Sequence, residues 1–140
     1  MSYVFYGHEG LDLAPVCDVK GIKTVYDLYD ALSDIWCADT CAPRMRADWT
    51  PANKTYGQCS ITAFLVQDIF GGIVRGIPLE DGNFHCYNVV GDSVFDLTSE
   101  QFLPQILTYS DSDPVQTREK HFAKQEKKER YELLSKLLMR

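Results

Sequence analysis

The chain has 140 residues, of which 45% are apolar and 24% are charged, and its formal net charge is −6. This length suits one hydrophobic core, so we expect a single domain over residues 1–140. No apolar run approaches the roughly 18 residues of a membrane span, and no basic segment followed by an apolar stretch marks a secretory signal. We therefore expect neither a membrane partner nor secretion.

Charge is distributed unevenly along the chain. Residues 118–140 hold eight Lys or Arg and four Asp or Glu, whereas residues 1–117 hold six and sixteen. The acidic body argues against nucleic acid as the main partner. The basic segment alternates in sign, which is typical of the solvated face of a helix, although a docking surface is the alternative. The five cysteines lack the spacing of a secreted scaffold, which indicates free thiols and a cytoplasmic location.

Two helices are predicted in the first half of the chain. Thr24 can cap the first, because apolar residues follow it at helical spacing. Those residues are Val25, Leu28, Leu32, Ile35 and Trp36. Proline and glycine interrupt residues 40–57, which we expect to form a loop. Residues 58–70 form the second helix, which is apolar around nearly its whole circumference and is therefore expected to be buried.

The second half of the chain is predicted to contain strands and two further helices. The expected strands are residues 73–78, 84–90 and 93–98, and the expected helices are residues 99–107 and 118–139. Gly91-Asp92 joins the last two strands as a hairpin turn. This order predicts an α+β fold in which a small antiparallel sheet packs on the buried central helix.

Cys59 lies at the predicted start of the central helix. Unpaired backbone N–H groups and the positive end of the helix dipole favour a thiolate there, and they would also hold a developing oxyanion. Gln58, immediately before it, can donate its side-chain amide to the same oxyanion. Cys59 is therefore a candidate nucleophile, and the alternative is a cysteine that packs in the core.

His85 and Asp96 are the candidate base and orienter for this thiol. If the hairpin turn has two residues, both lie on one face of the hairpin as diagonal neighbours, and Asn88 lies on the opposite face. A three-residue loop would instead place Asp96 with Asn88, which is the alternative orienter. A half-buried histidine that is bonded only for packing is the other interpretation of His85.

A zinc site is a rival interpretation of the same residues. Three residues separate Cys37 from Cys41, and Cys59, His85 and Cys86 could complete a ligand set. Structural zinc sites usually show two tight ligand pairs, which this arrangement lacks. We therefore expect no metal and no other cofactor.

The last predicted helix carries more apolar surface than one contact covers. We expect Tyr131, Leu134 and Leu138 to pack on the body, and Lys120, Lys124, Lys127 and Lys128 to face solvent. Leu133 and Leu137 form a neighbouring stripe, which suggests a homodimer through this helix. The alternative is a monomer whose body covers both stripes.

A set of motifs is spread along most of the chain. It comprises Trp36, Thr40, Pro43, Trp49, TYGQCSITAFLVQDIFGG at residues 55–72, HCYN at residues 85–88, DLTSEQF at residues 96–102, and Arg118, Phe122 and RYELL at residues 130–134. Over about residues 25–138 this pattern resembles the YunG-like family of small uncharacterised bacterial proteins. That resemblance implies no particular activity.

A more distant resemblance carries chemistry. Gly57-Gln58-Cys59, His85-x-Tyr87-Asn88 and Asp96-Leu97-Thr98 are similar to the GQC, HxWN and DxT motifs of transglutaminase-like, papain-fold cysteine enzymes. The likeness implies a papain-like or transglutaminase-like core. It also implies that Cys59 is the nucleophile, His85 the base, Asp96 the orienter and Gln58 an oxyanion donor.

These observations lead to one hypothesis and two rivals. The hypothesis is an amide hydrolase, deamidase or acyl transferase that uses a triad of Cys59, His85 and Asp96 on a peptide or another amide. The first rival is a non-catalytic binding or interaction module that retains the same fold, and the second is a structural zinc protein. No stretch of the sequence indicates a specificity pocket, so the sequence does not identify a substrate.

Overall fold

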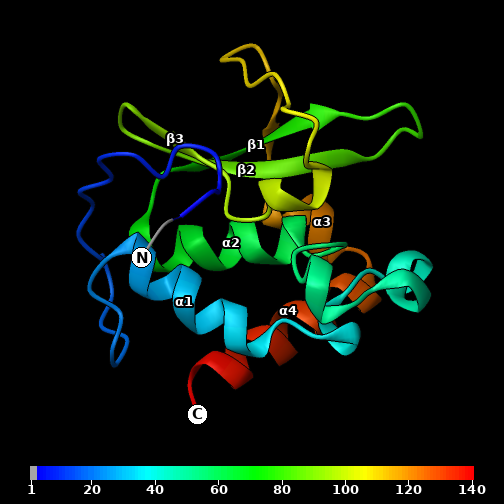
Figure 1. The fold of residues 1–140 in the computed structure, drawn as a ribbon, viewed down its shortest axis with the longest axis horizontal. Coiled ribbons are helices and arrows are strands. Elements are labelled where there is room, and N and C mark those ends of the chain that lie inside the picture. Colours follow the sequence, from blue (N-terminus) through cyan, green and yellow to red (C-terminus); the bar gives the residue numbers. More distant parts are fainter. Residues whose placement is uncertain (1–2) are drawn as a thin grey trace.

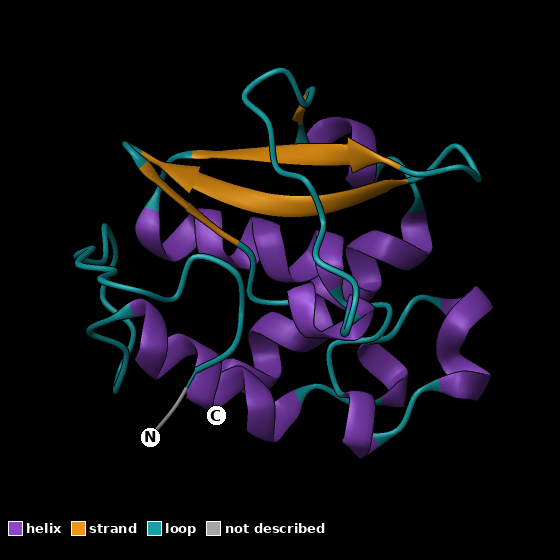
Figure 2. Ribbon diagram, turned by 45° about the horizontal axis from the view of Figure 1, so that its top comes forward, coloured by secondary structure: helices purple, strands orange, loops and turns teal. Residues whose placement is uncertain are grey.

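The computed structural model describes residues 3–140 and has an α+β fold. Its helices are α1 (Val25–Ile35), α2 (Cys59–Phe70), α3 (Arg118–Phe122) and α4 (Gln125–Leu138), and its strands are β1 (Ile73–Pro78), β2 (Phe84–Val90), β3 (Ser93–Phe95) and β4 (Val115–Gln116). Helix α2 runs through the middle, with the sheet on one side and α1 and α4 on the other (Figure 1). The same layers are visible from the turned direction of Figure 2.

Helix α1 begins where its sequence predicts. The Thr24 hydroxyl accepts the N–H of Asp27 at 3.1 Å, and the Asp27 carboxylate accepts the N–H of Thr24 at 3.1 Å, so the two residues form a capping box. Val25, Leu28 and Leu32 are buried on one face. The helix therefore packs one apolar stripe against the body, as its spacing indicates.

Helix α2 is the buried centre of the fold, as predicted. Nine of its twelve residues are buried, and they face both the sheet and the α1–α4 layer. Phe64 packs on the sheet side with Val74, whereas Ile61 and Leu65 belong to the larger core that includes α1 and α4. A helix that is covered on both sides needs an apolar surface all round.

The sheet has four antiparallel strands in the order β3-β2-β1-β4. Val89 pairs with Val94 and Asn88 with Phe95, which is the register of a two-residue turn at Gly91-Asp92. The predicted hairpin is therefore confirmed, and with it the faces on which its side chains lie.

Three elements differ from the prediction between the hairpin and α3. Strand β3 ends at Phe95, because Asp96 leaves β2 and instead makes a single bridge with Tyr6. The helix expected over 99–107 is only a 3₁₀ turn, Ser99–Phe102, since Leu103 precedes a proline and is disfavoured in the helical conformation. Strand β4, which was not predicted, adds two residues to the free edge of β1.

The helix expected over 118–139 is two helices, which is a correction. A break at Ala123 and Lys124 separates α3 from α4, although neither glycine nor proline stands there. Tertiary contacts account for it, because α3 is tied to α2 by an ion pair between Arg118 and Asp68, 2.7 Å apart. Helix α4 then packs in another direction, against α1 and α2 (Figure 1).

Helix α4 packs on the body through its predicted stripe. Leu134 is fully buried, and Tyr131 and Leu138 pack partly buried against the same core. Arg130 is also buried, and its guanidinium donates to the backbone oxygen of Thr40 at 2.9 Å. Lys127 is half-buried rather than exposed, which corrects the expectation that it faces solvent. None of the helices in residues 3–140 is both long and apolar enough to cross a membrane.

Candidate active site

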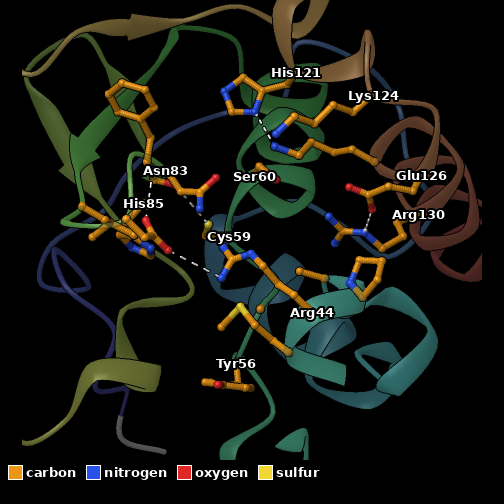
Figure 3. A pocket seen from close by; sticks show the side chains of 18 of the residues that line it. Arg44, Tyr56, Cys59, Ser60, Asn83, His85, His121, Lys124, Glu126 and Arg130 are labelled. Carbon is orange, nitrogen blue, oxygen red and sulfur yellow. Dashed lines mark hydrogen bonds and ion pairs between the residues drawn. The ribbon is translucent and has the colours of Figure 1, made fainter. Parts of the chain in front are cut away.

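A cavity of about 830 Å³ opens at the start of α2. Cys59 and Ser60 lie at its base, and His85 from the start of β2 lies beside them (Figure 3). Across from His85, residues of α3 and of the beginning of α4 form the opposite wall. The cavity thus exposes a thiol at a helix N-terminus to a space large enough for a small ligand.

The segment before α2 is shaped to place Cys59 at the base of this cavity. Gly57 has φ +72, and a Cβ atom there would lie 2.4 Å from the sulfur of Cys41. Its carbonyl oxygen accepts the N–H of Ala42 at 3.0 Å, and its own N–H donates to the side chain of Gln101 at 3.3 Å. Only glycine fits this close approach and this backbone conformation, so the chain turns sharply directly before the helix.

His85 and Asp96 make the side-chain contact that the hairpin register predicts. His85 Nε2 lies 2.6 Å from Asp96 Oδ2, and both side chains are 1% exposed. The imidazole edge also packs on the ring of Phe102, with centroids 4.7 Å apart. Because a carboxylate only accepts hydrogen bonds, Nε2 carries a proton, and Nδ1 remains for the thiol of Cys59.

Asp96 is itself held by several donors. Its Oδ2 accepts the hydroxyl of Tyr109 at 2.6 Å, and its Oδ1 accepts the backbone N–H and the hydroxyl of Thr98 at 3.1 and 3.2 Å. A buried carboxylate whose oxygens are all hydrogen-bonded keeps one orientation. Asp96 therefore holds the His85 ring in place.

Electrostatics favour a charged thiol and a charged imidazole. The contact with the Cys86 thiol lowers the pKa of Cys59 most, and burial raises it. The hydrogen bond and charge of His85 also lower this pKa, so that the lowering influences together outweigh burial. Burial disfavours the charged form of His85, but the charge and hydrogen bond of Asp96 and the contact with Cys59 raise its pKa to about 10. Both shifts favour a thiolate beside an imidazolium.

Cys86 is the buried neighbour of this pair. It follows His85 in β2 and packs with Ala63, Phe64 and Val74 on the face toward α2. Its hydrogen bond to Cys59, together with burial, raises the pKa of its own thiol well above the usual value. These influences keep the Cys86 thiol in its protonated form beside Cys59.

The side chain of Gln58 is not at the cavity. It is fully buried, its amide nitrogen donates to the backbone oxygen of Cys37 at 3.0 Å, and its oxygen has no hydrogen-bond partner within residues 3–140. Cys59 and Ser60 occupy the first turn of α2, where backbone N–H groups have no intrahelical acceptor. These N–H groups, rather than the Gln58 amide, are the free donors next to Cys59 in the sequence.

Asn88 lies on the other face of β2 from His85, as the two-residue turn predicts. Its amide donates to the backbone oxygen of Ala63 in α2 at 2.8 Å, and the residue is buried. It fastens the sheet to the central helix and does not contact His85. Asp96 is thus the residue that contacts the imidazole.

The charged residues of the cavity were not predicted as part of the site. The wall opposite His85 contains Lys120, His121, Lys124 and Lys127, which we call the basic wall. The charge asymmetry of the chain was the only available signal, because nothing in the sequence shows that α3 and α4 bend around the start of α2. Arg44 and Arg130 also line the cavity, and each pairs with a carboxylate: Asp81 at 3.7 Å and Glu126 at 2.9 Å.

Cysteine and histidine are not arranged here as metal ligands. Within residues 3–140, no group of three or more His, Cys, Asp or Glu side chains has the geometry to hold a metal ion. Cys37 and Cys41 lie in the turns before α2, and all five cysteines are free thiols. The rival zinc interpretation thus finds no preformed ligand set in this part of the chain.

Comparison with known proteins places the chain in a family. The YunG protein family matches residues 24–140, a stretch that includes Cys59, His85, Asp96 and the basic wall. The chain belongs to the YunG family. It is 41% identical over 54 residues to a Bacillus subtilis (strain 168) protein described as "Uncharacterized protein YunG". That match covers 39% of this chain and only 46% of the relative, and no solved structure matches significantly.

Proposed function

We propose that the protein is a cysteine-dependent acyl-transfer enzyme with Cys59 as nucleophile, His85 as general base and acid, and Asp96 as orienter. The observation that carries this proposal is the linked arrangement of thiol, imidazole and carboxylate at the base of a cavity. A buried histidine that only packs needs neither a charged partner on one nitrogen nor a low-pKa thiol on the other.

The geometry suggests the order of events. The Cys59 thiolate attacks the carbonyl carbon of an amide, and the oxyanion is held by the N–H groups that begin α2. The His85 imidazolium then protonates the leaving amine as the C–N bond breaks, which leaves a thioester on Cys59. A water molecule or a second amine attacks the thioester, His85 takes its proton, and the thiol leaves as a thiolate. Water gives hydrolysis or deamidation, and an amine gives acyl transfer.

The order of elements supports a papain-like or transglutaminase-like core. Cysteine begins the central helix, histidine lies at the start of the next long strand, and aspartate follows the hairpin partner of that strand. His85 bonds Asp96 through Nε2, which leaves Nδ1 for the sulfur. We propose this relationship on the site geometry and on the GQC, HxYN and DLT motifs.

Acylation by an activated ester tests the proposal directly. Cys59 of the intact protein is expected to form an acyl adduct with p-nitrophenyl acetate, detected by peptide mass spectrometry. The adduct should be absent in Cys59→Ser and slowed in His85→Gln. Cys17→Ser is the matched control, because Cys17 is an exposed free thiol far along the chain from the cavity.

Two results would contradict the proposal. One is acylation of Cys17 or Cys37 in preference to Cys59, and the other is an unchanged rate in folded His85→Gln protein. Either outcome would favour the rival interpretation, a binding module that retains the fold without turnover.

A further inference from the structure

The basic wall presents lysines that form no ion pair with a carboxylate of the described residues. In residues 3–140, the ion pairs include both cavity arginines but none of Lys120, Lys124 and Lys127. The rest of the chain is strongly acidic, so carboxylates were available to pair with them. Three unpaired ammonium groups on one wall of a cavity are a site for an anion.

Lys127 is held in this wall by a chain of hydrogen bonds. Its Nζ lies 2.8 Å from His121 Nδ1, and His121 Nε2 lies 2.8 Å from Gln116 Oε1. The Gln116 amide nitrogen donates to the backbone oxygen of Pro114 at 3.2 Å, which sets the direction of every bond in the chain. His121 therefore donates to Gln116 and accepts from Lys127, so it is neutral. Burial and the nearby charge of Lys127 agree with this, because they lower the pKa of His121 to about 4.

The packing around Gln116 and His121 leaves space for the hydrogen-bond chain that holds Lys127. Gln116 lies across β1 at Gly76, where a Cβ atom would come within 2.9 Å of the Gln116 amide. His121 is buried and packs on Phe64, with ring centroids 5.3 Å apart. The Lys127 ammonium thus uses one of its three N–H groups on a fixed acceptor, and the others remain for a ligand. A lysine placed only for solubility needs no such support.

The wall lies within reach of the Cys59 sulfur. The ring of His121 packs on Phe64. Phe64 is five residues after Cys59, or about 7 Å along the axis of α2. His121 and Lys124 extend over the cavity on the side opposite His85, with Cys59 and Ser60 between them (Figure 3). A ligand whose acyl carbon is at the sulfur can therefore place a group several bonds away against Lys127.

We infer that the acyl donor of Cys59 carries a carboxylate, which Lys127 binds together with Lys124 and Lys120. The substrate class is an acidic amide, such as an amide of a dicarboxylic acid or a peptide with an acidic residue beside the scissile bond. This inference rests on the proposed function, since it names the substrate of that site. A carboxylate takes two or more N–H donors, which matches the free groups of an ammonium supported from behind.

Two alkylating reagents of different charge test the inference. Iodoacetate and iodoacetamide both transfer a two-carbon group to the thiolate with loss of iodide, but only iodoacetate carries a carboxylate. In Lys127→Met, which keeps the apolar stem, the ratio of the iodoacetate rate to the iodoacetamide rate at Cys59 should fall about tenfold. Lys128→Met is the matched control, because Lys128 is exposed and does not line the cavity.

A second measurement does not depend on thiol reactivity. Glutarate should bind wild-type protein in calorimetry, bind Lys127→Met about tenfold more weakly, and protect wild-type Cys59 from iodoacetamide. Glutaramide, which is neutral, should do neither. Inorganic phosphate should bind more weakly than glutarate, and equal or tighter phosphate binding would overturn the assignment to a carboxylate.

The outcomes separate this inference from the proposed function. If Lys127→Met slows both reagents equally, Lys127 acts on the thiolate and the inference is wrong. The inference is also wrong if Lys127→Met leaves the ratio of the two alkylation rates unchanged and glutarate does not bind the wild type. In that case, acylation of Cys59 by p-nitrophenyl acetate would still support the proposed enzyme. If Cys59 is inert to both reagents but glutarate binding depends on Lys127, the enzyme proposal fails and the anion site stands.

Discussion

Replacing Asp96 with asparagine removes one charge and one acceptor oxygen from the candidate site. The amide keeps the shape of the carboxylate side chain, and its oxygen can still accept from the backbone N–H and hydroxyl of Thr98. Its NH2 group then stands in the place of Oδ2 and cannot accept from His85 or Tyr109. The charge that raises the pKa of His85 is lost, so burial, which opposes the imidazolium, dominates. Cys59 then loses the cation beside it and its pKa rises, although the contact with Cys86, which lowers this pKa most, remains.

The size of the effect is bounded by the ordinary pKa of a cysteine thiol. A thiol with the ordinary pKa of 9.0 is about 1% ionised at pH 7, so a full return of Cys59 to that value from a fully ionised state is the upper limit of the loss. Alkylation of Cys59 by iodoacetamide at pH 7 should therefore slow by up to about a hundredfold in Asp96→Asn. The loss should shrink as the pH rises, and above about pH 9 the variant and the wild type should react at similar rates.

The assay is the rate of Cys59 modification between pH 5 and 10, measured by peptide mass spectrometry on folded protein. Asp92→Asn is the matched control, because it removes a carboxylate from the exposed turn of the same hairpin. An Asp96→Asn profile that coincides with the wild type would refute the reasoning. So would a loss of equal size at every pH, because that indicates misplacement of the groups rather than a changed pKa.

Four further outcomes are expected. The difference in unfolding free energy between the wild type and a Cys59→Ala, His85→Gln double variant should not change between about pH 6.5 and 9. In that window, Cys59 and His85 together bind one proton in the folded state and one in the unfolded state. The difference should decline below that window, where the unfolded pair binds two protons, and above it, where the unfolded pair binds none. Gly57→Ala should cost about 2 kcal/mol or more in urea unfolding, through a positive φ and a clash with a sulfur, whereas Gly82→Ala, with a positive φ in open space, should cost about 1 kcal/mol; equal losses would contradict the packing argument. Removal of residues 118–140 should lower the melting temperature, and light scattering on the intact chain should show a dimer; a monomer would mean that the body covers both leucine stripes of α4. Elemental analysis of protein purified without added metal should show no stoichiometric zinc.

The hairpin was predictable because its rules are local. Alternating side chains and a two-residue Gly-Asp turn determine which residues share a face, so the contact between His85 and Asp96 could be predicted without a structure. The burial of α2 was predictable for a similar reason, since a helix that is apolar all round has no face for water. Each of these predictions depended on one segment and its own periodicity.

The orientation of Gln58 was not predictable from its position beside Cys59. Its side chain turns to the backbone oxygen of Cys37, 21 residues earlier, in a segment whose irregular turns have no periodicity. The break between α3 and α4 was equally hidden, because helical spacing continues through it and tertiary contacts outweigh the local preference. Both errors concern long-range contacts, and both affect which groups face the cavity.

The break in the C-terminal segment connects the fold to the candidate chemistry. In one continuous helix, residues 120, 124, 127 and 131 would form a single stripe, and the lysines would lie beside the partly buried Tyr131 or in solvent. The break instead lets α4 pack Leu134 in the core while Lys127 faces the cavity and meets His121 from α3. The segment that carries most of the basic charge therefore both completes the core and forms the wall opposite His85. A binding module would need the basic wall alone, whereas this wall faces Cys59, whose thiol has a lowered pKa, beside His85 and the buried carboxylate of Asp96. An acidic amide engages both sides of the cavity at once, which is why we assign the two sides to one substrate.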